Sequence, residues 1–490
     1  MVNGNLAYKL NNASGEEVVV NEAPLKWCSV TLSDVVSRGK RLEASVFDVE
    51  AKQARDTIAS SKYPCVPLLG ENGLIQKAYY PGRFKRIYCE RNEGVAFYLP
   101  SQMTDIYPKA EKFISRLTKC DVSELKLKPN TLLLTRSGTI GTISYVSKTT
   151  EGKVFSDDVI RVTFKSVFDT GYAYAFLKSK LGNIVLQTNG YGSVITHLEP
   201  EHLQETMIPN APDALKQKIH TLIAESYRLR DESNELIDEA TRLLIEELHL
   251  PPIEELNPIS KSAPVETFSV KLSRMAGRVD ASYHVPIVDE IVAHLKEHAE
   301  EVTTIGDNRI SKEVIMPIRF KRVYVDEGHG KVLLGGKQLY ELDPSGKKYL
   351  SASKHDGIMS KLEVDQNTTL ITRSGTIGKV ALVPKHWEHW VPSDHIIRIV
   401  PADESIAGYI NIFLSSDYGY ELITRYTYGS VVDEIDDNHV RQIPIPLLKN
   451  KDIQTRINEL ALQANQKRYE AYLLEQRALK VMDDEVIYAK

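Results

Sequence analysis

The residues of this chain best suited to chemistry occur twice, in the same order. The heptapeptide TRSGTIG stands at 135–141 and again at 372–378. Each copy places an arginine, hydroxyl side chains and two glycines at a predicted hairpin tip, where glycine lets backbone N–H groups approach a phosphate closely. Alternatively, the glycines only satisfy turn geometry and each arginine pairs with a downstream aspartate, Asp157 or Asp394. Both readings stay open for the polar candidates of these turns, which are Arg136, Ser137, Thr139, Arg373, Ser374 and Thr376.

Two further doubled runs carry candidate binding residues. The sequence RFKR stands at 83–86 and at 319–322, where the cations can hold nucleic-acid phosphates or simply line a solvated strand edge. The sequence YGS at 191–193 and 428–430 offers a tyrosine that can contact bases, or that packs half-buried. The candidates from these runs are Arg83, Lys85, Arg86, Tyr191, Ser193, Arg319, Lys321, Arg322, Tyr428 and Ser430.

These motifs belong to one long internal repeat. An offset of 237 residues also carries Gly171-Tyr172 onto Gly408-Tyr409, and RLEAS at 41–45 onto RVDAS at 278–282. A period of this length is far too long for a solenoid. The chain is therefore predicted to be one domain-plus-helix unit built twice, with short strands, turns and a few helices in each domain, which makes the fold class α+β.

The expected domain organisation follows from changes in composition along the chain. A polar N-terminal extension is followed by a first domain, a helix, a proline-rich linker, a second domain and a second helix. The expected ranges are 1–24, 25–210, 211–250, 251–264, 265–447 and 448–487.

The two helical stretches share a heptad seam. Apolar and small residues recur at 4-3 spacing over about four heptads, which indicates a coiled coil. The two seams keep the same register at an offset of 238, which favours an antiparallel pairing of the two helices over packing of each on its own domain. The expected seam includes Leu222, Leu229, Leu236, Leu460 and Leu474.

Composition places the chain among globular proteins of a reducing compartment. The net charge is −5, and the stretch 211–256 alone carries −6, so acid is concentrated on one helix and basic clusters lie elsewhere. The four cysteines lie in the first unit without counterparts in the second, which predicts free thiols in the cytoplasm. No apolar run reaches the length of a membrane span or forms a secretory leader.

Enzyme motifs are largely absent from the sequence. There is no phosphate-binding GxxxxGK[ST], no HExxH, no GxSxG and no adenine-methyltransferase tetrapeptide. His294 and His298 are four residues apart, but no third ligand is near, so we expect no metal site. We predict no catalytic residue and no cofactor.

Two tandem domains, each with a TRSGTIG hairpin, an SDxxIR strand, a GS loop and an exit into a long helix, resemble the specificity subunit of type I restriction-modification systems. The resemblance covers about residues 25–487. It implies two target-recognition domains held apart by antiparallel helices, each reading one half of a bipartite, asymmetric site on double-stranded DNA. It also implies that the chain is non-catalytic, that two DNA methyltransferase subunits dock on the helices, and that a helicase-nuclease subunit can join.

Base contacts are expected where the two copies differ, at 48–80 against 286–317 and at 104–128 against 341–365. Two other functions stay open. One is a scaffold of a defence complex that does not read DNA, and the other is a DNA-modifying enzyme that acts alone.

Overall fold

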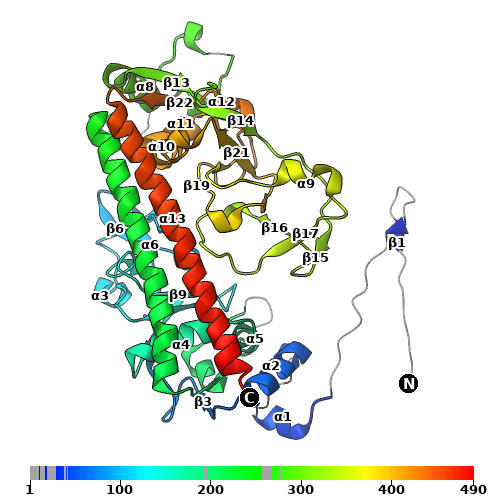
Figure 1. The fold of residues 1–490 in the computed structure, drawn as a ribbon. Coiled ribbons are helices and arrows are strands. Elements are labelled where there is room, and N and C mark those ends of the chain that lie inside the picture. The colour runs from blue at the N-terminus through cyan, green and yellow to red at the C-terminus, as the bar shows by residue number, and fades with distance from the viewer. Residues whose placement is uncertain are drawn as a thin grey trace.

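The computed structural model describes residues 10–11, 17–18, 29–37, 40, 42, 44–191, 196–256, 267–275 and 277–490. Within these residues the fold is α+β: two units of small sheets and short helices flank two long helices (Figure 1). We call residues 44–210 the first unit and residues 277–447 the second unit. The short elements before and between them include β1 (Leu10–Asn11), β2 (Glu17–Val18), α1 (Leu32–Ser37) and α7 (Ile253–Leu256).

The first unit contains two four-stranded sheets and a two-stranded one. The first sheet is antiparallel, in the order β4 (Ile75–Tyr79), β11 (Val159–Phe164), β8 (Leu132–Thr135) and β9 (Ile143–Tyr145). The second is mixed, in the order β10 (Val154–Phe155), β6 (Gly94–Tyr98), β7 (Lys112–Ser115) and β5 (Tyr88–Cys89). The third pairs β3 (Cys65–Pro67) with β12 (Met207–Pro209). The helices are α2 (Val49–Ala59), α3 (Val122–Leu125), α4 (Val167–Lys178) and α5 (Lys180–Thr188).

The second unit repeats this topology strand for strand. Its antiparallel sheet runs β14 (Ser311–Ile315), β21 (Ile396–Pro401), β18 (Thr369–Thr372) and β19 (Val380–Leu382). Its mixed sheet runs β20 (Val391–Pro392), β16 (Gly330–Leu334), β17 (Lys348–Ser351) and β15 (Tyr324–Val325). The third pairs β13 (Glu301–Thr304) with β22 (Pro444–Leu447). The helices are α8 (Pro286–His298), α9 (Asp356–Leu362), α10 (Glu404–Ser415), α11 (Asp417–Thr424) and α12 (Asp437–Arg441).

The repeated glycine-tyrosine pair explains how each unit meets its long helix. A Cβ on Gly171 would lie 2.7 Å from the Cα of His220, and one on Gly408 would lie 2.5 Å from the carbonyl oxygen of Asn458. Only glycine therefore allows α4 and α10 to approach the long helices this closely. The tyrosine that follows each glycine is buried, and its hydroxyl donates to the carbonyl of a proline 37 residues further on, Pro209 or Pro446.

The two long helices, α6 (Asp213–Glu247) and α13 (Lys451–Met482), pack along each other and run in opposite directions (Figure 1). Lys218 near the start of α6 bonds Glu485, whereas Glu232 further along α6 bonds Lys467. The expected ranges of the two helices, 211–250 and 448–487, differ from these bounds by two to five residues at each end. A turn of π-helix, Asp483–Ile487, follows α13.

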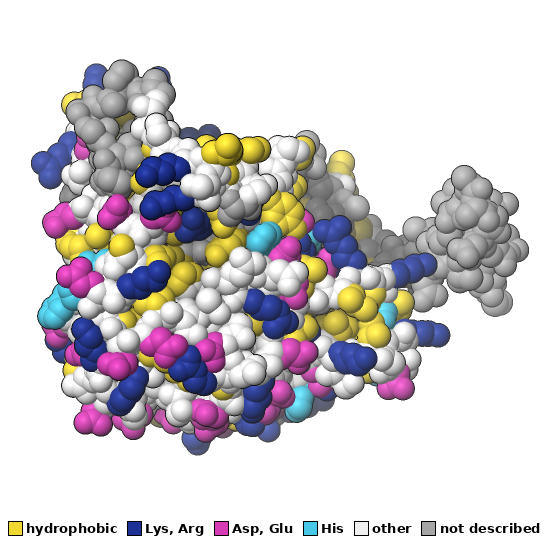
Figure 2. All heavy atoms as spheres, turned by 90° about the horizontal axis from the view of Figure 1, so that it is seen from above, with side chains coloured by type: hydrophobic (Ala, Val, Ile, Leu, Met, Phe, Trp, Pro, Cys, Tyr) yellow, Lys and Arg dark blue, Asp and Glu magenta, His cyan; other side chains and the backbone are white. Residues whose placement is uncertain are grey.

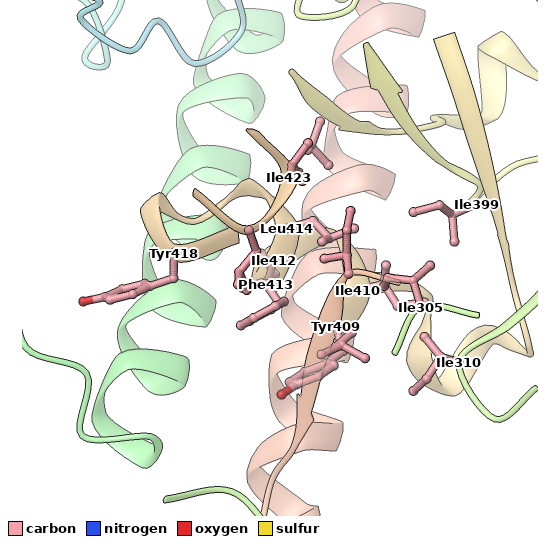
Figure 3. Close-up of a cluster of buried hydrophobic side chains, with 14 of the residues drawn as sticks. Ile305, Ile310, Ile399, Tyr409, Ile410, Ile412, Phe413, Leu414, Tyr418 and Ile423 are labelled. Carbon is pink, nitrogen blue, oxygen red and sulfur yellow. The ribbon is translucent and has the colours of Figure 1, made fainter. Parts of the chain in front are cut away.

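Each long helix completes the core of the other unit as well as its own. The end of α13, with Ala478, Val481 and Met482, is buried in the core of the first unit. The end of α6, with Ala240 and Leu244, is buried in the core of the second unit. Figure 3 shows part of that second core, with side chains of α10 and α11 beside Ile399 of β21 and the loop residues Ile305 and Ile310.

Candidate nucleic-acid interface

An extended segment links the two main sheets of each unit and carries the RFKR run. In the first unit Arg83 and Lys85 are exposed while Phe84 and Arg86 are half-buried, and residues 319–322 of the second unit show the same alternation. Phe84 packs edge-on against the buried ring of Phe97, at 6.2 Å between centroids. The aromatic ring anchors the segment, so the cations on either side of it point into solvent.

The last arginine of each run is held by an aspartate rather than left free. Arg86 donates to Asp157 at 2.5 Å, and the equivalent Arg322 donates to Asp394. These are the two aspartates that the alternative interpretation of the sequence paired with Arg136 and Arg373. Arg86 and Arg322 thus position the segment. Within the described residues Arg83, Lys85 and Lys321 are exposed and have no ion pair, and Arg319 is largely exposed but contacts Asp394 and Glu434.

The arginines of the two glycine turns are buried and neutralised. Arg136 is 7% exposed, bonds both Asp158 and Glu199, and lies 4.3 Å from the ring centroid of Tyr80. Because an ion pair removes the net charge that would attract a phosphate, this placement speaks against direct phosphate contact by Arg136.

The equivalent Arg373 is 5% exposed and equally engaged. It donates to the carboxylate of Glu434 and to the carbonyl oxygens of Asp394 and Ile435. The alternative interpretation expected ion pairs of these arginines with Asp157 and Asp394, whereas the carboxylates that they contact are those of Asp158, Glu199 and Glu434. Phosphate contact by Arg136 and Arg373 is thus a prediction that the geometry disfavours.

The tips of the glycine turns remain accessible. Thr139 and Thr376 are exposed, and Ser137 and Ser374 are half-buried. The first glycine of each turn has a positive φ, +81° at Gly138 and +76° at Gly375. Each of these two glycines has open space where a Cβ would lie. Backbone conformation therefore requires glycine there, and the space left free is available to a ligand.

The YGS loops lie beside the glycine turns. Tyr191 and Tyr428 are each 40% exposed. The backbone of Tyr191 pairs with His197, which also pairs with Ser137 of the turn, and Tyr428 pairs in the same way with Glu434, which also pairs with Ser374. Ser430 is exposed, whereas Ser193 lies outside the described residues, as do Arg41 and Glu43 of the RLEAS motif. In the second unit Arg319 and Arg373 contact the carboxylate of Glu434, and Tyr428 pairs with its backbone, so the cationic segment, the glycine turn and the tyrosine loop meet at one residue.

Part of the region expected to read bases is occupied by the other unit. The backbone N–H of Ile106 donates to the carbonyl of Tyr340 at 2.8 Å, and Asp105 pairs with Glu341. Ile106 packs with Leu229 and Leu342 between the long helices. The beginnings of the 104–128 and 341–365 stretches thus form a contact between units, which leaves their later parts for base contact.

The interface of the long helices contains a polar centre that the heptad pattern did not predict. Of the expected seam residues, Leu229 and Leu460 are buried, while Leu222, Leu236 and Leu474 are half-buried. Between them Glu475, 1% exposed, accepts from Arg230 and from Tyr174 at 2.5 Å each. A signal for this network was present, because an arginine and a glutamate stand close to apolar seam positions.

At the end of the molecule that carries α8 and β13, positive and negative side chains are mixed and do not form a patch of one sign. Figure 2 shows Lys and Arg side chains intermingled with Asp and Glu side chains over this face. Among the described residues there is no group of three or more His, Cys, Asp and Glu placed to hold a metal ion. Nor, in the described part of the chain, does any helix have the length and apolarity to cross a membrane. The three described cysteines are free thiols.

Solved structures similar to this chain include S subunits of type I restriction-modification systems. The S subunit from M. genitalium is 14% identical over 86% of this chain and 98% of its own, with a TM-score of 0.30. The HsdS subunit from Thermoanaerobacter tengcongensis is 12% identical over 86% of this chain and 99% of its own, with a TM-score of 0.26. A chain from a study of complex assembly and conformational transition in the type I R-M system is 11% identical over 85% of this chain and 98% of its own, also at 0.26.

No family model and no curated protein matches the sequence. Identities and TM-scores this low transfer no residue's role. What the chain does is therefore inferred from its own duplicated residues.

Proposed function

We propose that this chain is the non-catalytic DNA-recognition subunit of a type I-like restriction-modification or phage-defence complex. Each unit reads one half of a bipartite site on double-stranded DNA, and the two half-sites differ because the units differ. Partner methyltransferase subunits, two of them by the symmetry of the chain, carry out the chemistry, and a helicase-nuclease subunit completes a restricting complex.

One observation carries this proposal: the same cationic segment is exposed at equivalent places on both units. Arg83 and Lys85 in the first unit, and Arg319 and Lys321 in the second, are held outward by anchored neighbours. Exposed cations on a rigid element hold phosphates and set the register of a protein on a duplex. The neighbouring threonine tips and tyrosine loops then lie where they can contact bases.

The helix pair supports the spacing of two readers. α6 contains 35 residues, which corresponds to about 50 Å at ~1.5 Å per residue. Two readers on one face of a duplex have to be spaced by about 34–36 Å or a multiple of it. An antiparallel pair of helices tied at its centre can hold such a distance as a coiled-coil spacer, and its exposed faces are the surface that we assign to the methyltransferases.

The test is to express the chain with candidate methyltransferase subunits and map DNA methylation across the host genome. We expect a split, asymmetric target that disappears when the chain is omitted. Replacing residues 44–210 by those of a related chain should change one half of the target only. A single contiguous palindromic target would overturn the proposal, and so would DNA cleavage or methylation by the purified chain alone.

A scaffold that does not read DNA is the second candidate, favoured by the burial of Arg136 and Arg373 in ion pairs. It predicts that reversing the charges of Arg83, Lys85, Arg319 and Lys321 together leaves DNA affinity and complex assembly unchanged. Loss of DNA binding with intact assembly would reject it.

A further inference from the structure

The polar centre of the helix interface consists of Glu475 with Arg230 and Tyr174. The internal repeat places a second, equivalent site in the molecule, and that site lacks the glutamate. The 238-residue offset of the two long helices relates Arg230 to Arg468 and Glu475 to Ile237, and the 237-residue offset of the units relates Tyr174 to Asn411. On the first unit's side, Glu475 joins Arg230 and Tyr174. On the second unit's side, an arginine is present but an isoleucine stands where the glutamate would be.

A cavity of about 80 Å³ occupies the place of the missing carboxylate. Ile237, Asn411 and Arg468 line it, together with Ile106 and Trp387. At ~10–15 Å³ for each water, it has room for about five waters or for a small organic molecule. Its walls combine apolar side chains with a few convergent polar groups, which is typical of small-molecule sites.

Two donors of this cavity, from Arg468 and Asn411, lack a full set of acceptors, whereas Lys109 and Tyr107 in its lining donate to the carbonyl of Ser415 and to Asp238. The Nε of Arg468 donates to Ser233 at 3.3 Å, and among the residues described no carboxylate pairs with this guanidinium. Burial lowers the pKa of Arg468 to about 10. Asn411 is 6% exposed, and its Nδ2 has no hydrogen-bond partner. The Arg468 side chain is half-buried, and a fully buried donor such as the Asn411 Nδ2 is costly unless something accepts from it.

We propose that this cavity binds a small organic carboxylate, whose carboxylate group pairs with Arg468 as the side chain of Glu475 pairs with Arg230. The Nδ2 of Asn411 donates to the second oxygen, in the role that the hydroxyl of Tyr174 plays for Glu475. The short aliphatic part of the ligand lies against Ile237 and Trp387. This inference concerns the joint between the units and does not depend on DNA recognition.

Propionate is the probe, because it has the atoms of a glutamate side chain. We expect saturable binding of ¹³C-labelled propionate to the full-length chain, followed by NMR, and no binding of propionamide, which lacks the charge. Arg468→Met should weaken propionate binding by ~10-fold or more, because a charge-assisted hydrogen bond is removed. Ile237→Val keeps the cavity and should bind as the wild type does.

Ile237→Glu is the second variant and keeps the test decisive if Arg468→Met does not fold. It supplies the acid from within the chain, so it should bind no propionate and melt at a higher temperature than the uncharged Ile237→Gln. Absence of saturable propionate binding to the wild type would overturn the proposal, as would wild-type binding by either Arg468→Met or Ile237→Glu. Tighter binding of inorganic phosphate than of propionate at this site would reject the carboxylate class.

Discussion

Arg230 and Glu475 lie 245 residues apart in sequence and meet between the two long helices, with 2.5 Å between Nη2 and Oε2. Lys178 of the first unit lies 3.8 Å from the same carboxylate. One buried acid thereby joins α6, α13 and the first unit. Since a buried charge requires its partners in defined places, this centre fixes how far one helix can slide along the other.

Removing that acid should destabilise the protein strongly. Glu475→Gln leaves the buried Arg230 and the half-buried Lys178 without this counter-charge, so we expect a loss of about 3–5 kcal/mol in the free energy of unfolding. Urea denaturation followed by circular dichroism measures it. Glu485→Gln is the matched control, because Glu485 pairs with Lys218 at the surface, and it should cost at most about 1 kcal/mol. Similar losses in the two variants would contradict a buried centre.

Low pH should weaken the same charge network around Glu475. Burial by itself would raise the pKa of Glu475, but Arg230 and Lys178 outweigh it and hold that pKa at about 2. Since the folded-state pKa is below the unfolded one, the stabilisation is full above the unfolded pKa and is lost as the pH falls toward 2. Melting temperatures between pH 6 and pH 2 should fall more steeply for the wild type than for Glu475→Gln. Parallel curves for the two proteins would contradict a lowered pKa of Glu475.

The carboxyl group of Glu341 should make the protein less stable as the pH rises near neutrality, which is the opposite of the effect of Glu475. Burial at the contact between the units raises the pKa of Glu341 to about 7, and that of the facing Asp105 to about 6. An acid whose pKa is raised on folding binds its proton more tightly in the folded state, so stability falls as the pH rises through this range. We expect Glu341→Gln to melt above the wild type at pH 8 and to show a smaller drop between pH 5 and pH 8. An unchanged drop would mean that Glu341 is ionised throughout.

The exposed cations should determine how salt affects DNA binding. Replacing Arg83 and Lys85 by glutamine removes two candidate phosphate-binding cations, so the slope of log affinity against log salt should decrease in magnitude by about 0.9 for each phosphate that is no longer neutralised. Fluorescence anisotropy with labelled duplexes at several salt concentrations measures this slope, and Lys218→Gln on α6 is the control. An unchanged slope would remove these residues from the interface.

Two leucines of the helix seam should differ in how well they tolerate a charge. Leu229 is 8% exposed and packs with Leu342 and Ala471, whereas Leu236 is only half-buried. Leu229→Asp buries a charge without a partner and should cost about 3 kcal/mol or more, with Leu236→Asp costing less. Chemical denaturation of both variants tests the order, and the reverse order would mean that the helices pack in another register.

The positions of the long helices and of the repeated turns could be predicted because local sequence patterns encode them. A heptad pattern and a proline-rich linker need no information about distant residues, and α6 and α13 begin and end within five residues of the predicted limits. The repeat itself predicted that the second unit would have the strand order of the first. The seam pattern missed Arg230 and Glu475, because a charged residue at a buried position is recognisable only once its partner is known.

By itself the sequence determined that one unit occurs twice, that each unit ends in a long amphipathic helix, and that the same cations recur in both. Tertiary structure alone decided that Arg136 is buried against Glu199 while Arg83 points outward, and that Ile237 leaves Arg468 facing a cavity. The reason is physical: spacing along the chain encodes periodicity and turns. The partner of a charge depends instead on which distant side chains reach the same volume, and that is settled only when the two helices and both units pack together.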